Sequence, residues 1–277
     1  MLAFAYDGSL NGDWVAHYAV RFAANTLEKR LQLVHIREAS PPAHLRERIA
    51  RIAKECKLLG VVLETELHAR GRGGVAEQLL GIVPAGTTLV SGTRARPRNR
   101  FFLVGTVSAR LLSAGRLRII AIRVVHPGVL GQPGRVLLPL AGHPRGAAHA
   151  LPLLVLLGAD LHHLHVLLVR EVSRLRFRVL SGTAAERLVE SGRAFVVRVE
   201  EQLREGLAPH RFELDSSVVV SDDAPKEILI HAGKDRSRLI CLGASERTLR
   251  ERVIHGDAIE RVLRETPSDV AVYGGVR

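Results

Sequence analysis

The two halves of this 277-residue sequence repeat one pattern, in which short apolar runs with strand character alternate with amphipathic helical stretches. The first half has strand-like runs at residues 2–6, 31–36, 61–67, 87–90 and 117–125, and helical patterns at residues 14–27, 43–59, 75–82 and 107–113. The second half has strand-like runs at residues 136–140, 161–168, 218–220, 239–242 and 269–276, and helical patterns at residues 147–157, 184–203 and 225–232. Strands that alternate with helices indicate parallel βαβ units. We therefore predict two α/β domains of the same architecture.

A short linker separates the two repeats. Residues 127–133 (PGVLGQP) contain two prolines and two glycines, a composition typical of linkers. The sequence therefore predicts a first domain at residues 1–126 and a second domain at residues 134–277. Each is long enough to bury its own hydrophobic core.

Positive charge is concentrated in the first domain. Residues 1–126 hold 19 Lys and Arg against 9 Asp and Glu, a net charge of +10, whereas the remainder has a net charge of +2. Such an excess attracts polyphosphates or nucleic acids. Arginine outnumbers lysine 35 to 5. This ratio also favours a second explanation of the positive charge, a coding bias that places arginine on solvent-exposed surfaces. Both interpretations stay open for the domain as a whole.

The strongest chemical signal lies in residues 89–108 (LVSGTRARPRNRFFLVGTVS). A strand ends at Gly92, and Gly105, Thr106, Val107 and Ser108 open a predicted helix. The glycines let the backbone approach a ligand, and the free N–H groups at the positive end of a helix bind anions. We expect a phosphate here, with added hydrogen bonds from the Thr106 and Ser108 hydroxyls.

The loop between these glycines carries Arg94, Arg96, Arg98 and Arg100, whose planar guanidinium groups suit phosphate. We expect one or two of the four to contact phosphate and the others to face water. A second basic and glycine-rich loop, residues 70–74, either lies near the phosphates or simply turns the chain.

The spacing Gly92, two residues, Ala95, nine residues, Gly105, Thr106 resembles the nucleotide-binding signature of the universal stress protein family. That signature has Gly, two residues, Gly, nine residues, then Gly followed by Ser or Thr. Ala95 stands in place of the second glycine and adds a methyl group near the ligand. The resemblance covers almost the whole chain, since both repeats follow the family's order of strands and helices.

The resemblance implies a Rossmann-like fold, with an open, mainly parallel five-stranded sheet and helices on both faces in each domain. It implies ATP, with Mg²⁺, as the ligand of the first domain. Asp7, with Gly8 and Ser9, would lie beside the nucleoside, and main-chain groups of Ile36 would meet the adenine. Taken alone, Asp7 equally suits a local turn that it caps with Gly8 and Ser9. The family further implies that two domains pair through their last strands, residues 117–125 and 269–276 here.

The second repeat keeps this spacing and changes its chemistry. Gly243 is followed after two residues by Glu246, and after nine more by Gly256 and Asp257. Two carboxylates then stand where an anion would lie, and like charges about 4 Å apart repel by about 4 kcal/mol at an effective dielectric constant of about 20. Ala141 also stands where the first repeat has its Asp. We predict a degenerate site in the second domain.

Three histidines, His162, His163 and His165, suggest a metal site on the strand at 161–168. We interpret His165 as the repeat's counterpart of His35, which we assign a structural role. Since no third ligand stands out, the sequence predicts no metal site.

No catalytic motif is recognisable, so the sequence predicts a binding protein with no catalytic residues and leaves slow ATP hydrolysis open. Cys56 and Cys241 lie far apart without metal-like spacing, and the N-terminus shows no signal peptide. We therefore expect a reduced, cytoplasmic protein without a membrane partner.

Three functions are consistent with these features. The first is a nucleotide-dependent regulatory or stress-response protein that binds ATP in its first domain and acts on a protein partner, with a homodimer an open alternative. The second is an interaction scaffold of the same fold that binds no nucleotide. The third and weakest is a nucleic-acid-binding module that uses the basic domain.

Overall fold

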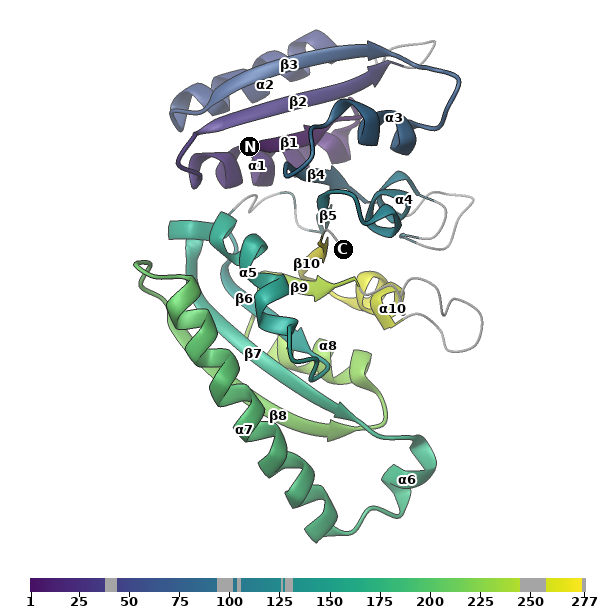
Figure 1. The fold of residues 1–277 in the computed structure, drawn as a ribbon, viewed down its shortest axis with the longest axis vertical. Coiled ribbons are helices and arrows are strands. Elements are labelled where there is room, and N and C mark those ends of the chain that lie inside the picture. Colours follow the sequence, from purple (N-terminus) through teal and green to yellow (C-terminus); the bar gives the residue numbers. More distant parts are fainter. Residues whose placement is uncertain are drawn as a thin grey trace. The chain divides into compact units, whose positions relative to one another are not determined.

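The computed structural model describes residues 1–37, 44–93, 102–103, 106–125, 127, 132–244 and 258–275. These residues form two compact units, one built mainly from residues 1–132 and the other mainly from residues 133–270. We call these units the first and second domains (Figure 1), although residues 271–275, predicted in the second domain, group with the first unit. Part of the predicted linker, residues 128–131, lies outside the described residues.

The first domain is built on five strands in the order β3-β2-β1-β4-β5. Their bounds are β1 (Leu2–Ala5), β2 (Arg30–Arg37), β3 (Val62–Ala69), β4 (Thr88–Gly92) and β5 (Arg118–Arg123). All neighbouring pairs are parallel, and β1 pairs with both β2 and β4. The direction of strand addition therefore reverses beside β1, which creates the crevice where such sheets bind ligands.

Four helices connect these strands: α1 (Leu10–Ala24), α2 (Leu45–Leu58), α3 (Val75–Ile82) and α4 (Val107–Ala114). α1 contacts α2, and α3 contacts α4, so that one pair of helices covers each face of the sheet (Figure 1). α1 buries one face because its apolar residues recur at helical spacing, with Val15, Tyr18, Ala19 and Phe22 all at most 1% exposed. The predicted α/β architecture is confirmed.

The second domain repeats this arrangement, with strands in the order β10-β9-β6-β7-β8. The strands are β6 (Gly134–Leu140), β7 (Leu161–Glu171), β8 (Glu213–Ser221), β9 (Leu239–Gly243) and β10 (Asp269–Gly274). The helices are α5 (Gly146–Leu157), α6 (Arg174–Arg178), α7 (Gly182–Gly206), α8 (Ala224–Lys234) and α10 (Ala258–Glu265), with a short 3₁₀ turn η2 (Gly158–Asp160). Each half of the chain is thus one copy of the same fold, as the repeat predicts.

Helix α7 is longer than predicted, with 25 residues. It covers β7 and β8, and buries Phe195, Val196, Val199 and Leu203. Gly192 allows a close approach, because a Cβ there would lie 2.5 Å from Cγ1 of Val218 on β8. The five-residue α6 has no buried residue, so apolar periodicity could not have predicted it.

The strand registers correct one interpretation of the repeat. In the first domain Ala3 pairs with Gln32, and in the second domain its counterpart Leu137 pairs with His165. The equivalence of Ala3 and Leu137 also follows on the other side, where they pair with Leu89 and Ile240. His165 therefore occupies the position of Gln32, and its assignment to the position of His35 is wrong by three residues.

Candidate functional site

One pocket of about 700 Å³ gathers the predicted site residues that the structure describes. These residues lie beyond the carboxyl ends of β1, β2 and β4 and at the start of α4: Asp7, Gly8, Ser9, Ile36, Gly92, Thr106, Val107 and Ser108. The pocket thus occupies the crevice at the reversal of strand order. The other predicted residues, Arg94, Ala95, Arg96 and Gly105, lie outside the described part of the chain.

The N-terminus of α4 points its free donors at this pocket. Thr106 is the N-cap, and its Oγ1 accepts from the amide of Ala109 (3.2 Å) while donating to the carbonyl of Leu103 (2.7 Å). The amides of Val107 and Ser108 have no acceptor among the described residues. Two N–H groups and the positive end of the helix dipole are therefore available to an anion.

The hydroxyls expected to bind phosphate serve the fold instead. The Thr106 hydroxyl is used by the cap, and Ser108 Oγ donates to the carbonyl of Gly92 (2.9 Å) while accepting from Ser91 Oγ (3.1 Å). These bonds hold the start of α4 against the end of β4. The backbone, rather than the hydroxyls, supplies the free donors here.

Asp7 takes part in a local turn, as the simpler interpretation of this residue predicts. Its Oδ1 accepts from the amide (2.9 Å) and the hydroxyl (2.6 Å) of Ser9. Ser9 in turn caps α1, because its Oγ accepts from the amide of Gly12 (3.1 Å). Gly8 has a positive φ of 74° that favours glycine. Asp7 is nevertheless exposed in the pocket and is the one acidic residue among its described lining residues.

Two arginines, Arg70 and Arg110, also line the pocket. Arg70 belongs to the basic loop at residues 70–74, which the sequence placed either near the phosphates or in a simple turn. Arg110 lies in α4, and the sequence did not predict it as a site residue. Gly74 leaves room for both Glu77 and Arg110, because a Cβ on Gly74 would clash with Oε2 of Glu77 and lie 3.2 Å from Nη1 of Arg110. Arg110 forms no ion pair with a carboxylate of the described residues. The pocket therefore combines positive charge with helix N–H groups.

Tyr6 and His35 form a buried polar wall of the pocket. The Tyr6 hydroxyl donates to Oδ1 of Asp13 (2.5 Å), and burial together with this bond raises the pKa of Tyr6 far above its usual range. Nδ1 of His35 donates to the carbonyl of Tyr6 (2.7 Å), since a carbonyl only accepts. This bond agrees with the predicted structural role of His35. Its Nε2 is then a buried acceptor with no partner among the described residues.

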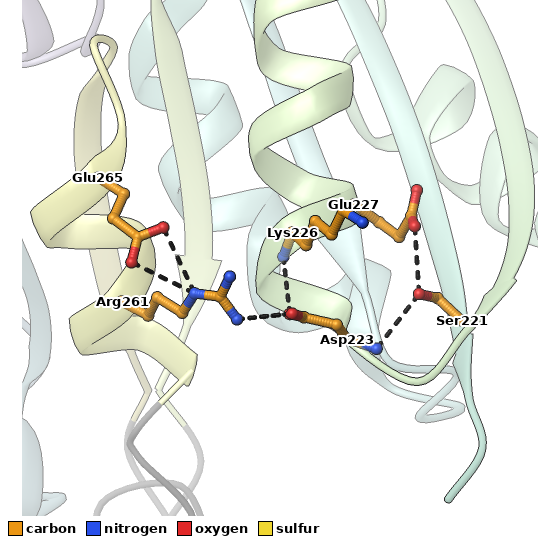
Figure 2. Close-up of polar contacts among 6 residues, drawn as sticks. All are labelled: Ser221, Asp223, Lys226, Glu227, Arg261 and Glu265. Atoms are coloured by element: carbon orange, nitrogen blue, oxygen red, sulfur yellow. Dashed lines mark hydrogen bonds and ion pairs between the residues drawn. The ribbon is translucent and has the colours of Figure 1, made fainter. Parts of the chain in front are cut away.

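The corresponding arginine of the second domain, Arg261, has different surroundings. Arg110 and Arg261 each lie 18 residues after the glycine that ends the preceding strand, Gly92 or Gly243. Nη1 of Arg261 donates to both carboxylate oxygens of Asp223, at 2.8 and 2.7 Å (Figure 2). Its Nε lies 3.3 Å from Oε1 of Glu265. Two carboxylates therefore pair with Arg261, whereas Arg110 has no ion pair with a carboxylate of the described residues.

Asp223 is held in place by the start of α8. Its Oδ1 caps the helix by accepting from the amide of Lys226 (3.0 Å), and its own amide donates to Ser221 Oγ (3.2 Å; Figure 2). Burial opposes ionisation of Asp223, but the hydrogen bonds from Arg261 and Lys226 outweigh it and hold the pKa of the carboxyl below its usual value. The predicted second signature loop, with Glu246, Gly256 and Asp257, lies outside the described residues.

Each domain is thus a doubly wound α/β unit, the class of fold that binds ligands beyond the carboxyl ends of its parallel strands. The sequence profile of the universal stress protein family matches residues 135–274, just over half of the chain. The chain belongs to the universal stress protein family. No curated protein sequence matches it.

Solved structures show the same fold over the whole chain. A universal stress protein from Archaeoglobus fulgidus DSM 4304 has a TM-score of 0.65 at 16% identity, covering 99% of this chain and 96% of that one. A protein described as a putative universal stress protein, from Pseudomonas aeruginosa UCBPP-PA14, has a TM-score of 0.62 at 16% identity, covering 98% and 92%. The cytoplasmic domain of a prokaryotic cation chloride cotransporter has a TM-score of 0.60 at 11% identity, covering 99% and 95%. Among the described residues, no helix has the length and apolar character needed to span a membrane.

Proposed function

We propose that the first domain binds ATP, with Mg²⁺, in the pocket beside β1 and β4, and that the chain acts as a nucleotide-dependent regulatory protein. The observation that carries this proposal is the pair of open amides at Val107 and Ser108, facing a pocket that also contains Arg70 and Arg110. Helix N–H groups and arginines together recognise phosphate. A volume of about 700 Å³ lies within the usual range for small-molecule sites.

The other end of the pocket suits a base. His35 lines the pocket and its Nε2 is buried without a partner among the described residues, and an acceptor there suits the exocyclic amine of adenine. Ile36 also lines this end, where β2 extends past β1. Mg²⁺ would be held chiefly by the phosphates, with Asp7 the one carboxylate of the described lining residues.

Binding, rather than catalysis, is the proposed role of this site. Asp7 Oδ1 accepts two hydrogen bonds from Ser9, Tyr6 is held neutral, and His35 Nδ1 is bound to a carbonyl. A second candidate, a scaffold that binds no nucleotide, is favoured by the hydroxyls of Thr106 and Ser108, both of which have partners within the fold.

The variant Val107→Pro tests the proposal at the helix terminus. Val107 is the first helical residue of α4, where proline fits, and Thr106 before it has the extended backbone (φ −92°, ψ 164°) that a following proline requires. The substitution removes one of the two open amides and keeps the helix. We expect Val107→Pro to weaken Mg²⁺-ATP binding about tenfold, the loss of one charge-assisted hydrogen bond, measured by isothermal titration calorimetry.

Two controls accompany this titration. Val107→Ala trims the side chain and retains the amide, and Gly182→Pro places proline at the first residue of α7 in the other domain. Both should bind ATP as the unmodified chain does. Equal affinity in Val107→Pro would remove the α4 terminus from the site, and the absence of saturable heat at millimolar ATP would favour the scaffold.

A further inference from the structure

A buried polar cluster lies between α8 and strands β7 and β8 of the second domain. His165 comes from the middle of β7, and His231 and Asp235 come from the C-terminal end of α8, one helical turn apart. One ligand atom from each of these three residues lies within 4.8 Å of the others. α8 packs directly against β7, so the cluster is formed within one domain.

The polar atoms that meet here have no hydrogen-bond partners. His165 Nδ1, His231 Nδ1 and Asp235 Oδ2 are all buried and unpaired within the described residues. His165 is only 6% exposed. Buried polar atoms are almost always paired, because an unpaired one loses its hydrogen bonds to water without replacement. Since one ligand atom from each residue lies within 4.8 Å of the other two, a single bound ion would satisfy the whole cluster.

The spacing of the cluster matches a set of metal ligands. His165 Nδ1 lies 3.3 Å from Asp235 Oδ2 and 3.2 Å from Oδ1 of Asp215 on β8. These atoms are close enough for an ion pair, but Nδ1 and the Asp235 oxygen are not aligned as donor and acceptor. Two ligands held tetrahedrally at about 2.0–2.1 Å from a zinc ion lie roughly 3.3 Å apart.

The remaining contacts favour the ligating form of the imidazoles. His165 Nε2 lies 2.8 Å from Ser217 Oγ, and a proton on Nε2 leaves the Nδ1 lone pair facing the cluster. Neutral imidazole is the form that binds metal ions.

The first domain supplies an internal comparison. Gln32, at the register position of His165, donates from Nε2 to Glu66 on the neighbouring strand at 2.7 Å. The same position thus carries an amide–carboxylate pair in one domain and a histidine cluster in the other. The sequence expectation of no metal site rested on two grounds. No third ligand stood out, and His165 was equated with His35, which the register does not support.

We propose that His165, His231 and Asp235 form a three-ligand binding site for a divalent transition metal ion, with Zn²⁺ the best fit and the fourth coordination position open. Two imidazoles and a carboxylate are donors that zinc accepts in tetrahedral geometry. The ion would join the C-terminal end of α8 to β7. Its role would be structural, because the cluster lies in the domain without the open pocket described above.

Zinc titration of the whole chain tests this proposal. The protein is stripped with EDTA, titrated with ZnCl₂ in a calorimeter, and the bound metal is counted by atomic absorption. We expect one Zn²⁺ per chain and a higher melting temperature in its presence. His165→Gln, which installs the first domain's residue, and Asp235→Asn should each weaken binding by more than about tenfold.

Two further measurements keep the test decisive. His162→Asn removes an exposed histidine of the same strand that lies outside the cluster, and it should bind zinc normally. Co²⁺ bound in place of Zn²⁺ should show no thiolate charge-transfer band, which excludes Cys56 and Cys241. The proposal is overturned if saturable zinc binding is absent, if it survives His165→Gln and Asp235→Asn in folded protein, or if His162→Asn abolishes it equally.

Discussion

Arg110 and Arg261 occupy the same position in the two domains and have opposite surroundings. Arg110 lines the pocket, whereas Arg261 donates to Asp223 and Glu265 (Figure 2). The two helix starts differ here, since Asp223 caps α8 with its carboxylate, whereas Gly74 caps α3 without a side chain and has Glu77 of α3 beside it. A carboxylate at the helix start therefore satisfies both the helix and the arginine, and no anionic ligand is needed there.

Asp223 has two separable contributions to stability. Asp223→Ala removes the cap of α8 and the ion pair, and should lower the free energy of unfolding by about 1–2 kcal/mol. Asp223→Asn keeps a good capping residue and removes only the charge, so it should cost about 0.2–1 kcal/mol. Urea unfolding measures both, with Asp222→Asn as the neighbouring control. Equal losses in the two variants would contradict a capping role.

The same residue predicts a pH dependence. The folded-state pKa of Asp223 lies below its usual value, so its charge stabilises the fold fully above an unfolded-state pKa of about 3.9. That contribution is lost as the pH falls through the folded-state pKa. The difference between the unmodified chain and Asp223→Asn should stay constant from about pH 7 to pH 5 and shrink below about pH 4. A difference that grows on acidification would contradict this assignment.

At the scale of helices and strands, local sequence patterns predicted most of the fold. The helix at 75–82 and the alternation of strands with helices are confirmed. Each element shows its apolar periodicity in its own sequence, so no distant contact is needed to predict it. Helix α6 was missed because it buries nothing. The cluster of His165, His231 and Asp235 was missed because its members come from elements that only the tertiary fold brings together.

In the candidate site too, the residues with a local sequence signal were predicted and those placed by tertiary packing were not. Asp7, Gly92 and Val107 were predicted from the signature and share one pocket. Arg110 and His35 were not predicted to line the pocket. The sequence around each residue does not indicate that its side chain faces the ligand side of the sheet. The hydroxyl of Ser108 was assigned to phosphate, yet it bonds to Gly92, a contact that depends on how α4 packs against β4.

The close packing of α7 on β8 gives a prediction at this scale. Gly192→Ala favours the helix by about 1 kcal/mol but forces a methyl group to within 2.5 Å of Val218, so we expect a net loss of about 1–2 kcal/mol. The double variant Gly192→Ala, Val218→Ala should lose less than the two single changes together. Gly233→Ala on α8, where nothing lies within 4 Å, should be neutral or stabilising in the same unfolding measurement. A stabilising Gly192→Ala would contradict the packing.

At the scale of the whole molecule, the two domains share one fold and differ in their polar residues. The first domain retains an open pocket with free helix amides, and the second pairs the corresponding arginine and carries the histidine cluster instead. The family membership and the α/β fold are shown, and the pairing of the domains through β5 and β10 stays a prediction. We propose that only the first of the two domains binds nucleotide.

The most direct test is calorimetric titration of Mg²⁺-ATP into the full chain beside the matched variants Arg110→Ala and Arg261→Ala. We expect one site per chain, an affinity reduced about tenfold in Arg110→Ala through loss of a charge-assisted contact, and no change in Arg261→Ala. Two sites per chain, or an affinity that depends on Arg261 and not on Arg110, would contradict it.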